Sequence, residues 1–321
     1  MLEPIKIKAA CKDYLWGGTK LKTEFNKESD LEKVAESWEL SAHKDGLSII
    51  TNGEEAGKDF LTYLSDAKTN VIGTKAEKEN VLPILIKLID AKENLSIQVH
   101  PSDEYAWENE NDNGKTEMWI ILENEPGACL YYGLKEDLTK DELRLKCIDG
   151  SIMESLNKVE VHPGDIFFIK PGTIHAIGAG IVLIEIQQTS NVTYRLYDYH
   201  RKDKDGNMRK LHLDKGVEVT NVNKVTAYTK PDVVLVDEEG LKVSKLRSCK
   251  YFTTYRYTSK KPVNFTISQE SFIAYSFING AGTLSYDDQS MDVKKGEAIF
   301  VPAQEGKITI DGDVDFIATT L

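Results

Sequence analysis

Hydrophobic and polar residues alternate with a period of two at many places after residue 80, as expected for strands with one buried face. The clearest case is residues 95–100, where Leu, Ile and Val occupy one face and Ser96, Gln98 and His100 the other. Residues 81–89 form a short, nearly continuous apolar run, and from residue 233 to the end only closely spaced strand patterns occur. The pattern therefore predicts a mainly β protein.

Helices are expected at fewer places. The capping-box pattern, Ser or Thr followed three residues later by Glu, occurs at Ser29, Thr139 and Ser151. The last two precede helix-forming residues, so we expect a helical insert at about residues 135–158. The first predicts a short helix near the N-terminus.

One segment is repeated within the chain. VHPGDIFF at residues 161–168 resembles VKKGEAIF at residues 293–300, and each has a turn glycine and an acid before an apolar strand. Because the two copies lie in two β-rich regions, the repeat favours two related barrels. We therefore predict one domain at residues 1–235, containing the helical insert, and a C-terminal β domain at residues 236–321.

The net charge and the cysteine spacing exclude some classes of function. The net charge of −12 over 321 residues argues against nucleic acid or anionic lipid as a partner, although a small anionic substrate could still bind a local basic pocket. The four cysteines include no Cys-x-x-Cys pair, so a thiolate zinc site is not expected. No signal peptide or bilayer-spanning run is recognisable, and free thiols fit a reducing compartment, so we expect a cytoplasmic protein.

Four polar side chains form a candidate metal site. Gln98 and His100 share one strand face, Glu117 begins the next predicted strand, and His175 follows a Pro-Gly turn. One carboxylate, two imidazoles and an amide oxygen suit a borderline divalent ion, best zinc. Without further context these could equally be unrelated polar residues, because a Gln-x-His pair is a weaker metal signal than His-x-His. In the C-terminal repeat Lys307 stands where His175 would be, so we expect no ion there.

The spacing of Gly164, Gly172 and His175 resembles the second half of the cupin motif. Several further segments, in the same order, look like type I phosphomannose isomerases: WGG at 16–18, ESWELS at 36–41, SIQVHPSD at 96–103, GKTEMW at 114–119, PGTIHA at 171–176 and NVTYR at 191–195. The resemblance runs from residue 16 to about residue 212, and the length fits the short bacterial branch. It implies two cupin-type, jelly-roll barrels, of which the second is degenerate.

The resemblance also implies roles for individual residues. One Zn²⁺ per chain would be held by Gln98, His100, Glu117 and His175. The motif positions imply substrate or catalytic roles for Ser96 (phosphate), Lys115 (acid–base or substrate binding) and Arg195 (catalysis). Two positions depart from the family pattern: Arg201 replaces a phosphate-binding lysine of longer members, and Asn191 replaces an aspartate, so no base is available there.

The implied activity is that of an aldose–ketose isomerase that interconverts mannose 6-phosphate and fructose 6-phosphate by zinc-assisted proton transfer through an enediol. Lys115 is the preferred group for that transfer, ahead of His100 or a water. One alternative is an iron-dependent cupin dioxygenase, whose usual ligand set fits a glutamine less well. The other is a non-catalytic sugar-binding or regulatory cupin, against which Lys115 and Arg195 argue.

Overall fold

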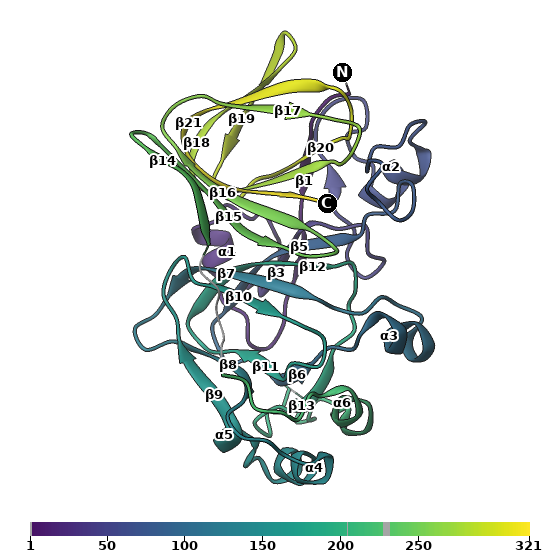
Figure 1. The fold of residues 1–321 in the computed structure, drawn as a ribbon, viewed down its shortest axis with the longest axis vertical. Helices are drawn as coiled ribbons and strands as arrows, with labels where there is room; N and C mark the ends of the chain where they lie inside the picture. Colours follow the sequence, from purple (N-terminus) through teal and green to yellow (C-terminus); the bar gives the residue numbers. More distant parts are fainter. Residues whose placement is uncertain (1, 204, 227–231) are drawn as a thin grey trace.

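The protein was examined as a computed structural model, which describes residues 2–203, 205–226 and 232–321. It is mainly β, as expected, and its strands form three antiparallel sheets within the described residues (Figure 1). The C-terminal strands, green to yellow in Figure 1, lie at one end of the molecule together with β1 (Ile5–Lys8), and most strands of the first two thirds of the chain lie toward the other end. No helix of the described part is long and apolar enough to cross a membrane.

Two sheets enclose the core of the first barrel. The six-stranded sheet has the order β10-β7-β12-β5-β3-β2, and the five-stranded sheet has the order β13-β6-β11-β8-β9. The strands of the first are β2 (Ala10–Lys12), β3 (Glu36–Leu40), β5 (Ile84–Ala91), β7 (Glu117–Asn124), β10 (Ile166–Ile169) and β12 (Ile181–Gln188). Those of the second are β6 (Ile97–Val99), β8 (Cys129–Leu134), β9 (Leu156–Glu160), β11 (His175–Ile177) and β13 (Tyr194–Tyr197).

A ten-stranded sheet forms the other end of the molecule, in the order β14-β15-β16-β21-β18-β20-β1-β4, with β17 on β21 and β19 on β18. Its C-terminal strands are β14 (Val233–Glu238), β15 (Leu241–Ser248), β16 (Thr253–Ser259), β17 (Val263–Ile267), β18 (Ile273–Tyr286), β19 (Gln289–Lys294), β20 (Ala298–Val301) and β21 (Gly306–Thr320). Two strands come from the chain start, β1 (Ile5–Lys8) and β4 (Ile49–Ile50). The division at residue 235 stays a prediction, and the N-terminal region contributes to both ends.

The six-stranded sheet lies between the other two, which explains the apolar run at residues 81–89. All residues of β5 and β12 are buried. On one face, Ile89 and Leu183 join the core of the first barrel; on the other, Leu88 and Ile184 pack with Phe300 and other residues of the ten-stranded sheet. A strand that is covered on both faces has no reason to alternate, so its sequence is hydrophobic almost throughout.

Short helices lie outside the sheets. They are α1 (Lys20–Thr23), α2 (Phe60–Asp66), α3 (Asp103–Glu110), α4 (Lys140–Asp149), α5 (Ile152–Ser155) and α6 (Leu213–Val219). The predicted insert contains α4 and α5, and Thr139 makes both bonds of its capping box. The helix predicted after Ser29 is wrong. There the Ser29 hydroxyl accepts from the N–H of Leu31, two residues on, which is a local turn and no helix cap.

The repeated segments have the same turn. Gly164 and Gly296 both have positive φ, at 95° and 86°. In each turn the following acid donates its N–H to a carbonyl three residues back and accepts a backbone N–H on its carboxylate: Asp165 with His162, and Glu297 with Lys294. The turns begin β10 and β20, so the eight-residue repeat marks equivalent places in two sheets.

Candidate metal centre and its cavity

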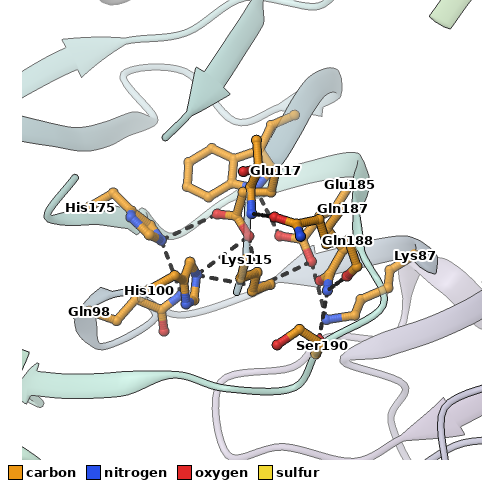
Figure 2. Close-up of polar contacts among 12 residues, drawn as sticks. Lys87, Gln98, His100, Lys115, Glu117, His175, Glu185, Gln187, Gln188 and Ser190 are labelled. Carbon is orange, nitrogen blue, oxygen red and sulfur yellow. Dashed lines mark hydrogen bonds and ion pairs between the residues drawn. The ribbon is translucent and has the colours of Figure 1, made fainter. Parts of the chain in front are cut away.

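The sheet register brings the predicted metal ligands together. Gln98 on β6 pairs with His175 on β11, and on its other side with Arg195 on β13. His100 follows β6, and Glu117 begins β7 in the opposite sheet. The ligand atoms of His100, Glu117 and His175 all lie within 4.8 Å of one another, and Figure 2 shows them converging with Gln98 on one point.

The side-chain nitrogen and oxygen atoms of these four residues lie close enough to one another to share one metal ion. Nε2 of His100 is 3.4 Å from one carboxylate oxygen of Glu117, and Nε2 of His175 is 3.3 Å from the other. The Gln98 amide nitrogen lies 3.4 Å from His175 Nε2. Because amide oxygen and nitrogen are interchangeable by a flip, Gln98 can present its oxygen at the same place.

Backbone carbonyls orient both imidazoles. His100 Nδ1 donates to the Val192 carbonyl at 2.9 Å, and His175 Nδ1 donates to the Thr173 carbonyl at 2.8 Å. Each Nδ1 therefore carries the proton, and each Nε2 lone pair faces the centre. This arrangement fixes the tautomer that a metal-binding histidine needs.

The protonation states also fit a cation. Burial, followed by the Lys115 charge, lowers the pKa of His100 to about 4, and burial lowers the pKa of His175. Burial alone would raise the pKa of Glu117, but Lys115 and the two imidazoles outweigh it and hold the pKa well below its usual value. Both Glu117 oxygens are buried, and their close neighbours are the Lys115 ammonium and the two imidazoles. Two neutral imidazoles and a buried carboxylate suit a divalent metal.

Lys115 lies directly beside this group. Its Nζ is 2.7 Å from Glu117, 3.3 Å from His100 Nε2 and 3.7 Å from Glu185. The preceding Gly114 lets this segment approach closely, since a Cβ there would be 2.4 Å from the Asp103 nitrogen. The lysine is buried, so its ammonium is held against carboxylates and away from bulk water.

A row of buried polar residues extends from Lys115 across the six-stranded sheet. Trp119, Glu185, Lys87 and Trp38 are neighbours in register on β7, β12, β5 and β3. The Trp119 indole donates to Glu185 at 2.8 Å, and Lys87 lies 3.1 Å from Glu185 and 3.6 Å from Glu36. Burial alone would lower the pKa of Lys87, but Glu36 and Glu185 outweigh it and raise the pKa. The sequence pattern did not predict this row, although a lysine within an apolar run was a usable signal.

A cavity of about 270 Å³ opens beside the metal group. Its lining includes four of the predicted site residues, namely Ser96, Gln98, Lys115 and Arg195. It also includes residues for which we had predicted no role, namely Tyr14, Glu36, Lys87, Glu185 and Arg209. Asn191 and Trp16 line it as well, and the Asn191 amide donates to Asp45 at 2.9 Å. The structure thus collects most of the predicted residues around one hollow.

The three arginines near this cavity differ in their surroundings. Arg195 donates from Nη1 to the Lys210 carbonyl at 2.9 Å, while its buried Nε has no partner. Burial, followed by the Arg209 charge, lowers the pKa of Arg195. Arg209 lines the cavity and binds Asp198 through two nitrogens, at 2.8 and 2.6 Å. Arg201 is not among the lining residues: it contacts Asp198, the Asn94 carbonyl and Glu93.

Comparisons with known proteins agree with this picture. The family model described as the phosphomannose isomerase type I catalytic domain matches residues 5–134, and the one described as the mannose-6-phosphate isomerase cupin domain matches residues 242–321. Mannose-6-phosphate isomerase of Streptococcus mutans is 34% identical over 319 residues, covering 99% of this chain and 98% of that protein. Mannose-6-phosphate isomerase ManA of Bacillus subtilis is 36% identical over 320 residues, covering 99% of both.

Solved structures show the same fold. The crystal structure of the mannose 6-phosphate isomerase from Bacillus subtilis superposes with a TM-score of 0.91 at 34% identity, over 99% of both chains. A putative mannosephosphate isomerase from Archaeoglobus fulgidus reaches a TM-score of 0.77 at 22% identity, over 99% of this chain and 98% of that one. The second likeness concerns the fold alone.

Proposed function

The chain belongs to the type I phosphomannose isomerases, and from that membership we propose that it interconverts mannose 6-phosphate and fructose 6-phosphate. The observation that carries the proposal is the buried His100, Glu117 and His175 group at the side of a cavity that also contains Lys115 and Arg195. An aldose–ketose isomerase needs these parts together: an electrophile for two neighbouring oxygens, a group that moves a proton, and a site for the distant phosphate.

The metal is proposed to be zinc, held by Gln98, His100, Glu117 and His175. A bound zinc ion would polarise the carbonyl and hydroxyl oxygens of the sugar without redox chemistry. The carbonyl partners of the two imidazoles support this assignment, because they keep both Nε2 atoms free for a cation. An iron dioxygenase is less well supported, because the glutamine would occupy one of the positions that oxygen chemistry needs open.

Lys115 is the group that we assign to proton transfer. Its Nζ lies 3.7 Å from Glu185, and both residues line the cavity, so an amine and a carboxylate stand together beside a bound sugar. His100 is less suitable, because its Nε2 points into the metal group. Asn191 lines the cavity but has an amide, which can orient a hydroxyl and cannot act as a base.

The phosphate is proposed to bind at the arginine end of the cavity, where Ser96 also lies. Arg209 lines the cavity, and Asp198 offsets the combined charge of Arg209 and Arg201 only in part, whereas Arg195 is assigned to the negative charge that develops on the enediolate. A sugar phosphate dianion would complete that balance. Both Arg201 and Arg209 bind Asp198, but Arg209 lines the cavity, whereas Arg201, which we predicted as a phosphate ligand, does not. We therefore propose Arg209 for this role, with Arg201 holding Asp198 in place.

A coupled isomerase assay with metal analysis tests the proposal. The purified protein should convert mannose 6-phosphate to fructose 6-phosphate, lose turnover after chelation, and regain it with zinc. Oxygen uptake with added Fe(II) and no isomerisation would favour the dioxygenase. Tight binding of the sugar phosphate without turnover would favour the non-catalytic alternative. The cytoplasmic location remains a proposal, supported by four free cysteines, which fit a reducing compartment.

A further inference from the structure

We propose that His212 is a positioning residue for Arg195: it holds the Arg195 backbone from the outer edge of the sheet, so that the guanidinium stays in the cavity. The inference rests on the role of Arg195 within the proposed function. It concerns a histidine that does not line the 270 Å³ cavity and that had no expected role.

The contact is two-sided. The Arg195 N–H donates to Nδ1 of His212 at 3.1 Å, and the His212 N–H donates to the Arg195 carbonyl at 2.8 Å. Lys210, two residues earlier, accepts from Arg195 Nη1 through its carbonyl at 2.9 Å. Residues 210–212 thus hold both the backbone and the guanidinium of Arg195.

The position in the sheet explains why such a contact is needed. β13 is the edge strand of the five-stranded sheet, and on its inner side Arg195 pairs with Gln98 of the metal group. An edge strand leaves the N–H and C=O groups of its outer side without a neighbouring strand. His212 satisfies both groups of Arg195, so this residue is fixed between the metal-bearing strand and the 210–212 segment.

The side chain of His212 is committed to this contact. His212 is the N-cap residue of α6, yet its side chain makes no capping bond to that helix. Nδ1 can accept from Arg195 only when it carries no proton. Burial and the neighbouring Arg195 and Lys210 charges lower the pKa of His212, which favours the unprotonated ring. The histidine therefore serves the Arg195 backbone in place of its own helix.

The guanidinium depends on this placement because little else holds it. Among the described residues its hydrogen bond is the one to the Lys210 carbonyl, and its buried Nε has no partner. A shift of the backbone would therefore carry the charge away from the reacting groups. A misplacement of about 1 Å can cost on the order of 10²-fold in rate.

Two substitutions separate the hydrogen bond from packing. His212→Leu keeps a branched side chain but removes the acceptor, and we expect kcat to fall about 10- to 100-fold with zinc content and KM unchanged. His212→Asn places an amide oxygen where Nδ1 lies and should restore most of kcat. His162→Leu and His162→Asn, at an exposed histidine in the Gly164 turn, are the matched controls and should change neither parameter.

A double-mutant cycle tests whether His212 acts through Arg195. In an Arg195→Ala background, His212→Leu should cause no further loss of kcat, because the displaced group is already absent. The same fold loss in both backgrounds would overturn the inference, as would equal kcat for His212→Leu and His212→Asn. Absence of isomerase activity in the unmodified protein would instead contradict the proposed function.

Hydrogen exchange at the Arg195 amide, followed by NMR, gives a readout independent of turnover. We expect faster exchange in His212→Leu and protection like that of the unmodified protein in His212→Asn. Unchanged exchange in His212→Leu would contradict the positioning role. If His212→Leu does not fold, His212→Gln provides the comparison: its amide lies one bond farther out, so it should leave the amide less protected than His212→Asn does.

Discussion

The two barrels begin a strand from the same turn and then differ in what their neighbouring strands carry. Ile169 of β10 is paired with Glu117, while the equivalent Val301 of β20 is paired with Ile273. At the position where the first barrel places the carboxylate that we propose as a metal ligand, the second therefore has an aliphatic side chain. The backbone arrangement alone does not create a metal site.

The next row across the sheets shows the same contrast. In the first barrel the row reads Trp119, Glu185, Lys87. In the second, the equivalent strands β18, β21 and β16 carry Tyr275, Ala318, Tyr255. Burying charges costs several kcal/mol per ion even when they are paired. The first barrel thus buries charged side chains beside the proposed active site, whereas the core of the second barrel is apolar and aromatic. The difference between the two barrels thus lies in the side chains at a few equivalent strand positions, while the backbone arrangement is the same.

Substitution of Glu117 is expected to have the largest effect and tests the difference between the barrels most directly. Glu117→Gln removes the negative charge that the two imidazoles and Lys115 face, so we expect the protein to lose its metal. Turnover should fall by more than about 10²-fold, since mutation of residues that only support a metal ligand already reduces metal affinity or activity about 10- to 100-fold. Its counterpart Ile273→Val should leave metal and activity unchanged and cost roughly 0.5–1.5 kcal/mol of unfolding free energy. Metal analysis, kcat and denaturant unfolding measure both. Metal retained by Glu117→Gln would contradict the site.

Arg195 lies on β13, outside the rows of strands compared above. We therefore expect its removal to reduce catalysis without affecting metal binding or folding. Arg195→Ala should remain folded and bind zinc, yet lose about 10²–10³-fold in kcat, because a donor aimed at developing negative charge is lost. Arg195→Lys should recover only part, because a point charge cannot reproduce the fork. Near-normal kcat with raised KM would instead assign Arg195 to uniform substrate binding.

The two turns should differ in how they tolerate a side chain. A Cβ at Gly296 would lie 1.9 Å from the Phe25 carbonyl oxygen, whereas at Gly164 the nearest atom is Arg256 Nη1 at 3.7 Å. Gly164→Ala should therefore cost about 1–2 kcal/mol for its positive φ alone, and Gly296→Ala distinctly more. Chemical denaturation of both variants measures the difference. Equal losses would show that the Phe25 segment moves aside.

A smaller effect distinguishes the two candidate phosphate ligands. Arg209→Ala should raise KM for mannose 6-phosphate about tenfold or more, since a hydrogen bond to a charged group contributes about 1.5–3 kcal/mol. Arg201→Ala should have a weaker effect, because Arg201 does not line the cavity. Steady-state kinetics at fixed ionic strength measure both. A larger KM increase for Arg201→Ala would restore the assignment made from sequence.

The sequence was informative where a local pattern matched a local structure. Alternation placed Gln98 and His100 on one face, and the capping box at Thr139 predicted α4. Features that depend on distant segments were not predictable in this way. Lys87 is a charged residue in an apolar run whose partners lie on other strands. Only the folded chain shows that Arg209 lines the cavity and Arg201 does not. The motif at Ser29 failed because a two-residue turn competes for the same hydroxyl.

The pairing of β1 with β20 affects the order in which the chain can fold. Ile5 lies opposite Phe300, and the Lys6 ammonium contacts Glu297 across 291 positions of sequence. At a synthesis rate of about 5–20 residues per second, roughly 15 to 60 seconds pass between the synthesis of β1 and that of β20. Until β20 is made, the edge of β1 that it will cover is open to pairing with other strands, so misassembly can begin at this edge.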